Sequence, residues 1–371
     1  MSLIHATGEV ARAKIVARVT TGRMMPAMSC FDHLVVNQFL ATEIDARALK
    51  SAFELGLVNW LQDRGATLLP ELSHELGLNS VGLGALAGML ETNAVLVRSG
   101  DMVELTHEFT RALAFRDLLH TRIDFADCVW PDIHELFTPL LNDVQQFMAR
   151  SRIFELFRYD RCFDVTPQNL EATRLWTRFT TCLTKYESAA VIAAVEMGNV
   201  ETLIDLGGNT GEFALRICER LPRIRATVVD LPVVCELGRE HIAGSAPLSQ
   251  TSRIDFHPSD IRSGDLPTPA DLVSFKSVLH DWPDRDAKLL IERAHSIVRP
   301  GGRIMIFERA PLDLRERRVT YAMAPDLVFL HFLRPPELYL EALAALGFVS
   351  IDYQRIELEI GFHLIVARRP A

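Results

Sequence analysis

After about residue 200 the chain alternates short apolar runs, rich in β-branched residues, with segments of helical periodicity. This alternation is typical of βαβ units in a parallel sheet and predicts a doubly wound α/β domain. Gly347 predicts the end of a last helix before two final strands. The expected strands are Thr202 to Leu206, Ala226 to Asp230, Ile254 to Ile261, Leu272 to Lys276, Ile304 to Glu308, Val349 to Ile356 and Phe362 to Ala367, and the expected helices are Glu212 to Leu221, Arg285 to Ile297 and Pro336 to Leu346.

The chain before this domain is predicted to be mainly helical. Helices at Ala46 to Leu55, Leu69 to Leu76 and Ser80 to Asn93, followed by two short strands around Arg98 to Asp101, have the order of a winged helix. From Glu43 to Thr110 there are four Lys or Arg against ten Asp or Glu, and the third helix has no basic residue. Its apolar positions therefore predict a face that packs on a second chain rather than on DNA. Three regions are expected, 1–113, 114–199 and 200–371.

The composition excludes several classes of protein. At 371 residues, 49% hydrophobic and 23% charged, the chain is expected to fold into about two globular domains. Its net charge of −9 disfavours nucleic acid as a partner. No apolar run reaches about 18 residues and Met1 to Met28 lacks the pattern of a secretory signal, so we expect a cytoplasmic protein without membrane contact. The six scattered cysteines lack metal-ligand spacing, which predicts reduced thiols and no metal.

A glycine-rich loop follows the first strand of the α/β domain. Residues 205–211 read Asp-Leu-Gly-Gly-Asn-Thr-Gly, which departs from the G-x-G-x-x-G of dinucleotide sites and fits the D-x-G-x-x-x-G of S-adenosylmethionine sites. Asp205 is expected to face an ammonium group, and Gly207, Gly208 and Gly211 to admit the amino-acid moiety. A nicotinamide site and a plain surface turn are the alternatives.

The next two strands end in further acidic residues. Asp230, 25 residues after Asp205, lies at the tip of the second strand, where one carboxylate can bind both hydroxyls of a ribose. Leu231 follows it, and Asp260 with Ile261 after the third strand could hold and flank an adenine. Asp230 as the cap of the next helix is the alternative.

His280 follows the fourth strand and is the candidate general base. An imidazole can accept a proton at neutral pH, as a hydroxyl or thiol that attacks a methyl sulfonium requires. The next strand ends at Glu308, 28 residues later. If the two strands are neighbours, Glu308 can orient the imidazole and favour its charged form. Asp281, adjacent to His280, completes the candidate catalytic set.

These motifs together resemble the plant-type small-molecule O-methyltransferase family, which includes bacterial members. The residues that carry the resemblance are Asp205 to Gly211, Val229 to Pro232, Lys276, His280 to Asp284 and Arg299 to Glu308. The resemblance implies a class I methyltransferase Rossmann-like sheet, preceded by a mainly α, winged-helix-like dimerisation domain in residues 1–113, with substrate-contacting helices in 114–199. It also implies a homodimer, S-adenosylmethionine as cofactor, His280 as base with Glu308 as its partner, and Lys276 near the cofactor.

Three positions depart from the family pattern. Asn209 replaces the usual central glycine, and it tolerates the left-handed conformation. Leu333, before Arg334, stands where plant members have a second glutamate beside the base, and Tyr186 stands where they often have histidine. Two alternatives therefore stay open. One is an enzyme of this fold that methylates S, N or C or transfers no methyl, and the other is a winged-helix regulator that senses a metabolite.

The acceptor is expected to be a small molecule bound between the sheet edge and the helical middle. Aromatic and apolar side chains line such sites around a few polar groups. Arg334 is a candidate partner for an acidic group of the substrate. The candidate wall residues are Trp130, Phe179, Leu183, Tyr186 and Phe332.

Overall fold

The computed structural model describes residues 16–17, 29–315 and 318–371, so the expectation about a secretory signal falls almost wholly outside the described residues. Its main sheet has the strand order β1-β10-β11-β9-β8-β5-β6-β7. The strands from β9 to β7 run parallel, and β11 is antiparallel to both of its neighbours. The strands are β1 (Val16–Ala17), β5 (Thr202–Leu206), β6 (Arg225–Asp230), β7 (Ile254–Pro258), β8 (Ala270–Lys276), β9 (Val298–Arg309), β10 (Val349–Glu357) and β11 (Gly361–Arg368).

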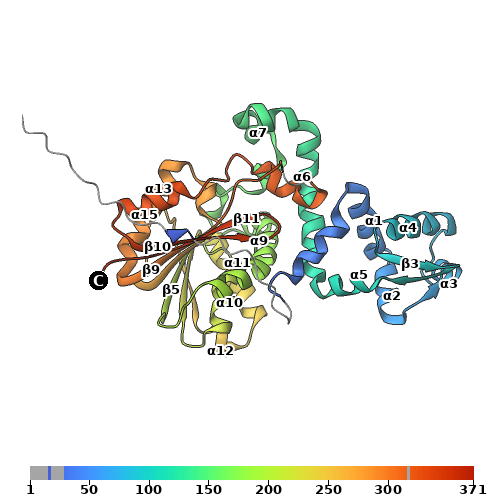
Figure 1. Ribbon diagram of the computed structural model, residues 1–371, viewed down its shortest axis with the longest axis horizontal. Helices are drawn as coiled ribbons and strands as arrows, with labels where there is room; N and C mark the ends of the chain where they lie inside the picture. The colour runs from blue at the N-terminus through green and yellow to red at the C-terminus, as the bar shows by residue number, and fades with distance from the viewer. Residues whose placement is uncertain (1–15, 18–28, 316–317) are drawn as a thin grey trace, which may run out of the picture.

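Helices cover both faces of this sheet, as the doubly wound prediction requires (Figure 1). One face packs on α10 (Glu212–Arg220), α11 (Pro232–Ser245) and the end of α9 (Pro167–Ala194), with α12 (Leu248–Thr251) beside them. The other face packs on α13 (Asp284–Ile297) and α15 (Glu337–Ala345). The predicted α/β class is confirmed, with every expected strand and helix of the domain present.

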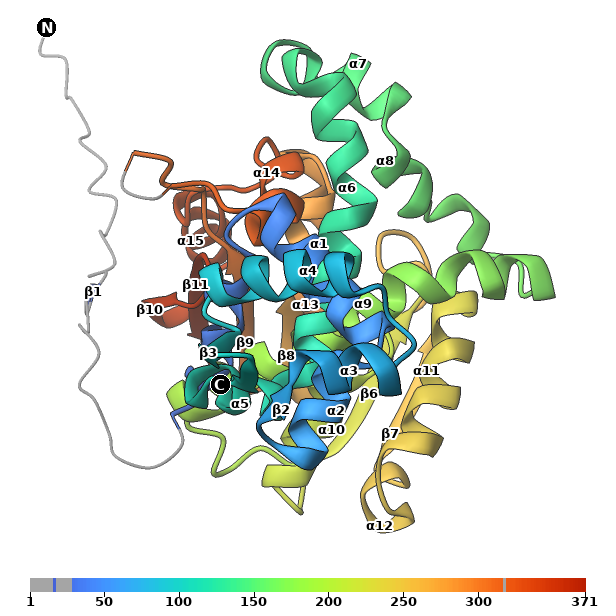
Figure 2. The same ribbon diagram turned by 90° about the vertical axis from the view of Figure 1, so that its right-hand side faces the viewer.

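The N-terminal region is mainly helical with a three-stranded sheet of order β2-β4-β3 (Figure 2). Side-chain caps explain where its helices begin, since Thr42, Asn79 and Thr106 each accept a hydrogen bond from the backbone N–H three residues later. The strands after α4 form the hairpin predicted for a winged helix. The elements are η1 (Asp32–Leu40), α1 (Glu43–Glu54), α2 (Leu57–Arg64), β2 (Thr67–Leu68), α3 (Leu69–Glu75), α4 (Ser80–Thr92), β3 (Leu96–Ser99), β4 (Met102–Leu105), α5 (His107–Ala112) and η2 (Leu113–Phe115).

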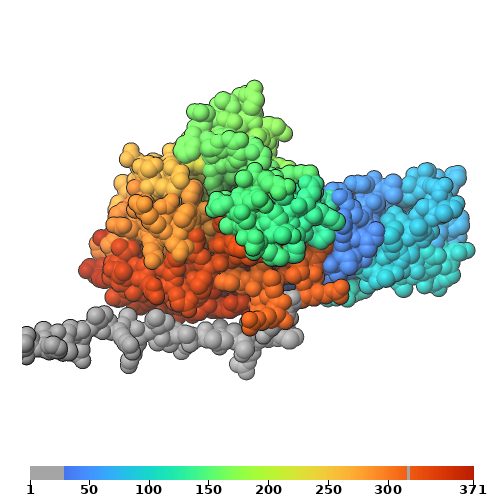
Figure 3. All heavy atoms as spheres, turned by 90° about the horizontal axis from the view of Figure 1, so that it is seen from above, coloured from blue at the N-terminus to red at the C-terminus, as the bar shows by residue number. Residues whose placement is uncertain are grey.

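The helical middle joins the N-terminal region to the α/β domain. One hydrophobic cluster runs from η1 through α6 (Arg116–Asn142) to α14 (Ala324–Val328), which packs against α6 although about two hundred residues separate them. The remaining elements of this part are α7 (Val144–Arg150), α8 (Arg152–Leu156), η3 (Asp160–Cys162) and η5 (Tyr321–Met323). In Figure 3 the blue and cyan part of the N-terminal region forms one end of the molecule, and the green middle segment lies against the orange and red C-terminal part. The helical middle thus covers the carboxyl edge of the sheet, and we call it the helical roof.

Two further observations bear on the composition-based expectations. Among the described residues, no helix is long and apolar enough to cross a membrane, and no group of three His, Cys, Asp or Glu is placed to hold a metal ion. All six cysteines are unpaired, and Cys162, Cys218 and Cys235 are buried.

Candidate active site

The turn after β5 requires glycine at its first two positions. Gly207 has φ +68°, and a Cβ there would lie 2.7 Å from Val278 Cγ1. A Cβ on Gly208 would lie 2.6 Å from Asp205 Oδ2. A side chain at either position would collide with these atoms, so the backbone of the turn is packed directly against the sheet edge. Asn209 adopts the left-handed conformation at φ +54°, as expected for the residue that replaces the central glycine.

Asp230 ends β6 and faces the same turn. Its Oδ2 accepts a hydrogen bond from Asn209 N at 2.8 Å, and its Oδ1 accepts one from Leu231 N at 2.7 Å. Burial raises the pKa of Asp230 to about 6, against these two N–H groups, which favour the ionised form. Each carboxylate oxygen keeps a lone pair directed away from the backbone, so the group can accept two further hydrogen bonds.

Asp205 is placed differently from the expectation. Its side chain is fully buried beneath the turn and does not line the cavity described below. Ser274 Oγ donates to its Oδ1 at 2.6 Å, and burial raises its pKa to about 7. Asp205 therefore lies below the turn, outside the lining of the cavity in which we expected it to face a ligand's ammonium group.

His280 and Glu308 meet because β8 and β9 are parallel neighbours, with Lys276 opposite Phe307. Glu308 Oε2 lies 2.6 Å from His280 Nδ1. Its other oxygen, Oε1, accepts from Val278 N at 2.7 Å and Leu279 N at 2.6 Å. The carboxylate has no exposed surface and every contact fixes the turn η4 (Leu279–Asp281) that carries the imidazole. Nδ1 therefore carries a proton, and Nε2 is the free ring nitrogen.

The charges around His280 raise its pKa. Burial alone would lower it, but the carboxylates of Asp281 and Glu308 and the hydrogen bond from Nδ1 outweigh burial. Conversely, burial acts to raise the pKa of Glu308, yet the imidazole and the two backbone N–H groups hold it below its usual range. The pair is thus built to stabilise an imidazolium beside a carboxylate.

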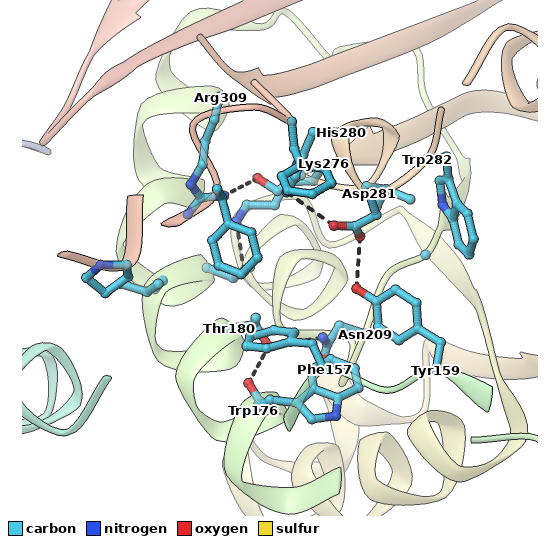
Figure 4. A pocket seen from close by; sticks show the side chains of 18 of the residues that line it. Phe157, Tyr159, Trp176, Thr180, Asn209, Lys276, His280, Asp281, Trp282 and Arg309 are labelled. Atoms are coloured by element: carbon cyan, nitrogen blue, oxygen red, sulfur yellow. Dashed lines mark hydrogen bonds and ion pairs between the residues drawn. The ribbon is translucent and has the colours of Figure 1, made fainter. Parts of the chain in front are cut away.

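Asp281 lies on the other side of the imidazole. Its Oδ1 is 3.4 Å from His280 Nε2, and its Oδ2 accepts a hydrogen bond from Tyr159 Oη at 3.0 Å (Figure 4). Burial raises the pKa of Asp281 above its usual range. Tyr159 comes from the loop before η3 and was not anticipated, because no sequence motif marks it.

These groups open onto one cavity of about 330 Å³ between the sheet edge and the helical roof (Figure 4). Gly208, Gly211 and Glu308 support it without lining it. The residues singled out from the sequence that do line it are Gly207, Asp230, Leu231, Asp260, Ile261, Lys276, His280, Asp281, Leu183 and Phe332.

Lys276 lines the cavity, and its ammonium group contacts side chains of α9. Its Nζ donates to Thr184 Oγ1 at 2.9 Å and pairs with the buried carboxylate of Glu187. Arg309 Nη2 also donates to Glu187, at 2.7 Å. Two cations share this one carboxylate, whose pKa falls to about 2 because their attraction exceeds the effect of burial.

Four of the six candidate substrate residues lie outside the lining of the cavity. Trp130 Nε1 donates to Glu43 of the N-terminal region at 2.7 Å. Tyr186 Oη donates to Asp117 of α6 at 2.5 Å, and its ring centroid lies 5.4 Å from that of His33. Phe179 is stacked behind Phe125 with ring centroids 4.8 Å apart.

Arg334 is the fourth of these residues. Its Nε donates to Asp284 Oδ1 at 2.6 Å, and its terminal nitrogens donate to the carbonyls of Leu279 and Trp282. The guanidinium thus holds the turn that carries His280 instead of facing a substrate.

The cavity wall also contains residues that sequence reasoning missed. Leu333, noted as the replacement of a glutamate, contributes an apolar surface. Aromatic rings come from α6, from α9, from the chain between these helices and from the chain after α14, and charged groups stand among them. The missed wall residues include Phe125, Phe154, Phe157, Tyr159, Trp176, Phe329, Arg122, Arg309, Asp326 and Glu359.

Comparisons with known proteins agree with this geometry. A family model described as the O-methyltransferase domain matches residues 138–337, more than half of the chain. The mitomycin biosynthesis 6-O-methyltransferase of Streptomyces lavendulae is 26% identical over 302 residues, which cover 80% of this chain and 82% of that protein.

Two solved structures have the same fold. The mitomycin 7-O-methyltransferase superposes with a TM-score of 0.65 at 21% identity, covering 87% of this chain and 94% of that one. Human N-acetylserotonin methyltransferase, solved in complex with S-adenosylmethionine, superposes with a TM-score of 0.59 at 21% identity, covering 88% and 94%. With the family model spanning the helical roof and the His280–Glu308 pair, the chain belongs to the O-methyltransferase family.

Proposed function

We propose that this enzyme transfers a methyl group from S-adenosylmethionine to a hydroxyl of a small molecule, and that His280 takes the hydroxyl proton. The observation that carries the proposal is the fully buried Glu308, which holds His280 by Nδ1 and leaves Nε2 for the cavity that Asp230 also lines. A proton acceptor and a candidate ribose-binding carboxylate in one cavity suit a reaction between the cofactor and a hydroxyl.

The residues around the glycine turn fit this cofactor. Asp230 has lone pairs for two ribose hydroxyls, and Gly207 lines the cavity beside it. Asp260 and Ile261 stand beside them for the adenine. When bound, S-adenosylmethionine supplies an electrophilic methyl on a sulfonium sulfur.

The chain's own residues manage the proton in this reaction. As the substrate oxygen bonds to the methyl carbon and the carbon–sulfur bond breaks, the hydroxyl proton passes to His280 Nε2, leaving a methyl ether and S-adenosylhomocysteine. Glu308 and Asp281 stabilise the resulting imidazolium, consistent with the raised pKa of His280. Positioning of the two reactants in the cavity supplies the larger part of the acceleration.

The proposal is tested by incubating the enzyme with S-adenosylmethionine labelled in its methyl group and a panel of phenols. We expect label in a methyl ether and one S-adenosylhomocysteine formed per ether. Conversion of a substrate without S-adenosylhomocysteine would instead identify a same-fold enzyme that transfers no methyl, and label on sulfur, nitrogen or carbon would correct the acceptor atom.

The variant Glu308→Gln tests how His280 is positioned. If the amide oxygen keeps the N–H groups of Val278 and Leu279, its NH₂ faces Nδ1 and favours the tautomer with the proton on Nε2, which cannot accept. Loss of the negative charge also lowers the pKa of His280. We expect a lower kcat, an acid limb of the pH–rate profile moved to lower pH, and unchanged affinity for S-adenosylhomocysteine. An unmoved acid limb would contradict the positioning role.

We also propose a separate role for each of the three regions. Residues 1–113 form a homodimer, residues 114–199 cover the substrate, and residues 200–371 bind the cofactor. A cytoplasmic location belongs to the same proposal and is supported by the six unpaired cysteines.

The apolar residues exposed on the N-terminal region support dimerisation, since such patches usually meet a partner. They include Ile44, Leu68, Val81, Met89, Val97 and Met102.

Substitution of Val81 by glutamate is expected to convert the dimer into monomers. Val81 lies on α4 with 79% of its surface exposed, so a charge there does not disturb the fold but would be buried in a dimer. Sedimentation of wild type, Val81→Glu and the exposed control Glu108→Gln gives the answer. A wild-type monomer would refute dimerisation, and a dimeric Val81→Glu would move the interface away from α4.

A further inference from the structure

The end of the cavity under α6 and α14 contains charged groups that the methyl-transfer step does not use. Arg122 comes from α6, Asp326 from α14, Arg309 from the end of β9 and Glu359 from the turn between β10 and β11, and all four line the cavity. Four separate elements thus bring charges to a wall that is otherwise largely aromatic. Charged side chains placed in such a wall usually fix a ligand's orientation.

Arg122 has an unused donor there. Its Nη2 pairs with Glu359 Oε1 at 3.0 Å, while its Nε–H has no hydrogen-bond partner among the described residues. The side chain is only 7% exposed. A buried N–H without an acceptor destabilises the protein, so a ligand oxygen that reaches this atom would remove that penalty.

Asp326 lies at the same end of the cavity, and its carboxyl makes no hydrogen bond with a described residue. Its one charged contact is with Arg309 Nε at 3.9 Å, too long for a hydrogen bond. The terminal nitrogens of Arg309 are already used, since Nη2 donates to Glu187 and Nη1 donates to Ser277 Oγ, both at 2.7 Å. Nothing described therefore satisfies the Asp326 carboxyl.

The charges that face Asp326 nearly cancel. Burial is the largest influence and raises its pKa to about 7, Arg309 and Arg122 lower it, and Glu359 and Glu187 raise it. In its protonated form Asp326 is a donor. Among the described residues, Arg122, Arg309 and Lys276 then stand against Glu187 and Glu359, a balance of one positive charge at this end of the cavity.

We propose that this end of the cavity binds a carboxylate of the acceptor, with Arg122 Nε–H and the Asp326 carboxyl as its two hydrogen-bond donors. Two unused donors and a net positive charge suit a group that only accepts hydrogen bonds and is itself negative. The rings of Phe125, Phe154 and Phe329 beside them suit an aromatic framework. The inference rests on the proposed function and specifies its substrate as an aromatic hydroxy acid.

Binding of three matched probes tests the proposal: 6-hydroxy-2-naphthoate, its carboxamide and 2-naphthol. Each is titrated by calorimetry into the full-length enzyme saturated with S-adenosylhomocysteine, at pH 6 and pH 8. We expect the carboxylate to bind at least about tenfold more tightly than the carboxamide at pH 6. Its affinity should fall about tenfold at pH 8, where Asp326 with a pKa of about 7 is mainly ionised.

Variants of Asp326 and Arg122 test whether these two residues cause the preference for the carboxylate. Asp326→Asn stays neutral and can still donate, so it should bind the carboxylate at both pH values with equal affinity. A fall that persists in this variant would assign the pH dependence to another group, such as His280, and would contradict the role of Asp326. Asp124→Asn, on α6 but outside the cavity, is the matched control.

Arg122→Met should abolish the preference for the carboxylate over the carboxamide. Because it leaves Glu359 buried beside an apolar side chain, the double variant Arg122→Met/Glu359→Gln provides a second version if the single one fails to fold. Arg174→Met, which breaks a surface ion pair with Glu240, is the matched control.

The results of these titrations distinguish a failure of this inference from a failure of the proposed function. If S-adenosylhomocysteine binds but the carboxamide binds as tightly as the carboxylate, or no probe binds, the carboxylate site is wrong and the methyltransferase proposal stands. If S-adenosylhomocysteine itself does not bind, the proposed function fails and this inference fails with it.

Discussion

The variant His280→Ala is expected to lose methyl transfer by roughly 100- to 10,000-fold in kcat, the usual contribution of a positioned general base. Alanine removes the nitrogen that accepts the proton, while Glu308 keeps its bonds to the N–H groups of Val278 and Leu279, so the turn stays in place. The affinity for S-adenosylhomocysteine should remain at the wild-type value. The measurements are kcat at saturating substrates and a calorimetric titration.

The control for this variant is His107→Ala, an exposed histidine at the start of α5, which should behave as wild type. Turnover of His280→Ala close to wild type would remove His280 from the mechanism. Loss of both turnover and S-adenosylhomocysteine binding would point to a collapsed turn, and thermal unfolding of the variant distinguishes that result from loss of the base.

The His280–Glu308 pair could be predicted from the sequence because its position depends on local patterns. β5 has the predicted bounds, and β8 and β9 end within one residue of the expected positions. Once two parallel strands are neighbours, their carboxyl ends meet at one edge, so residues just beyond those ends come together. The same logic placed Asp230 correctly beside the glycine turn.

The cavity wall could not be predicted in this way, because it is made by helices whose contacts are distant in sequence. Phe125 and Phe179 are stacked on each other, and helical periodicity does not tell which of the two rings faces the cavity. Asp326 reaches the site only because α14 packs on α6. Such pairings depend on tertiary packing and leave no motif.

Several charged and polar candidates make contacts that the sequence does not predict, for a related reason. Arg334 and Tyr186 each found a carboxylate, Asp284 and Asp117, that the sequence does not place near them. Asp205 points into the sheet because Ser274 on the neighbouring strand supplies a donor there. A polar side chain at a strand end has two directions available, and the partner on the adjacent strand decides between them.

Removal of the Asp230 carboxylate is the second change with a large expected effect. Asp230→Ala should weaken S-adenosylhomocysteine binding on the order of 100-fold, because two hydrogen bonds to a charged group are lost. The N–H groups of Asn209 and Leu231 also lose their acceptor. Calorimetry gives the affinity, and Asp255→Asn on β7, whose side chain is exposed, is the control.

The pH dependence of binding tests the same carboxylate without removing it. Ribose hydroxyls donate hydrogen bonds to the ionised form, and burial raises the pKa of Asp230 to about 6, so the wild-type affinity for S-adenosylhomocysteine should fall as the pH drops through 6. Asp230→Asn should bind more weakly and without this fall. A wild-type affinity that stays constant from pH 8 to 5 would mean that Asp230 does not bind the cofactor in its ionised form. The ribose would then have to be held by the backbone of the glycine turn, and Asp230 would serve only to fix Asn209.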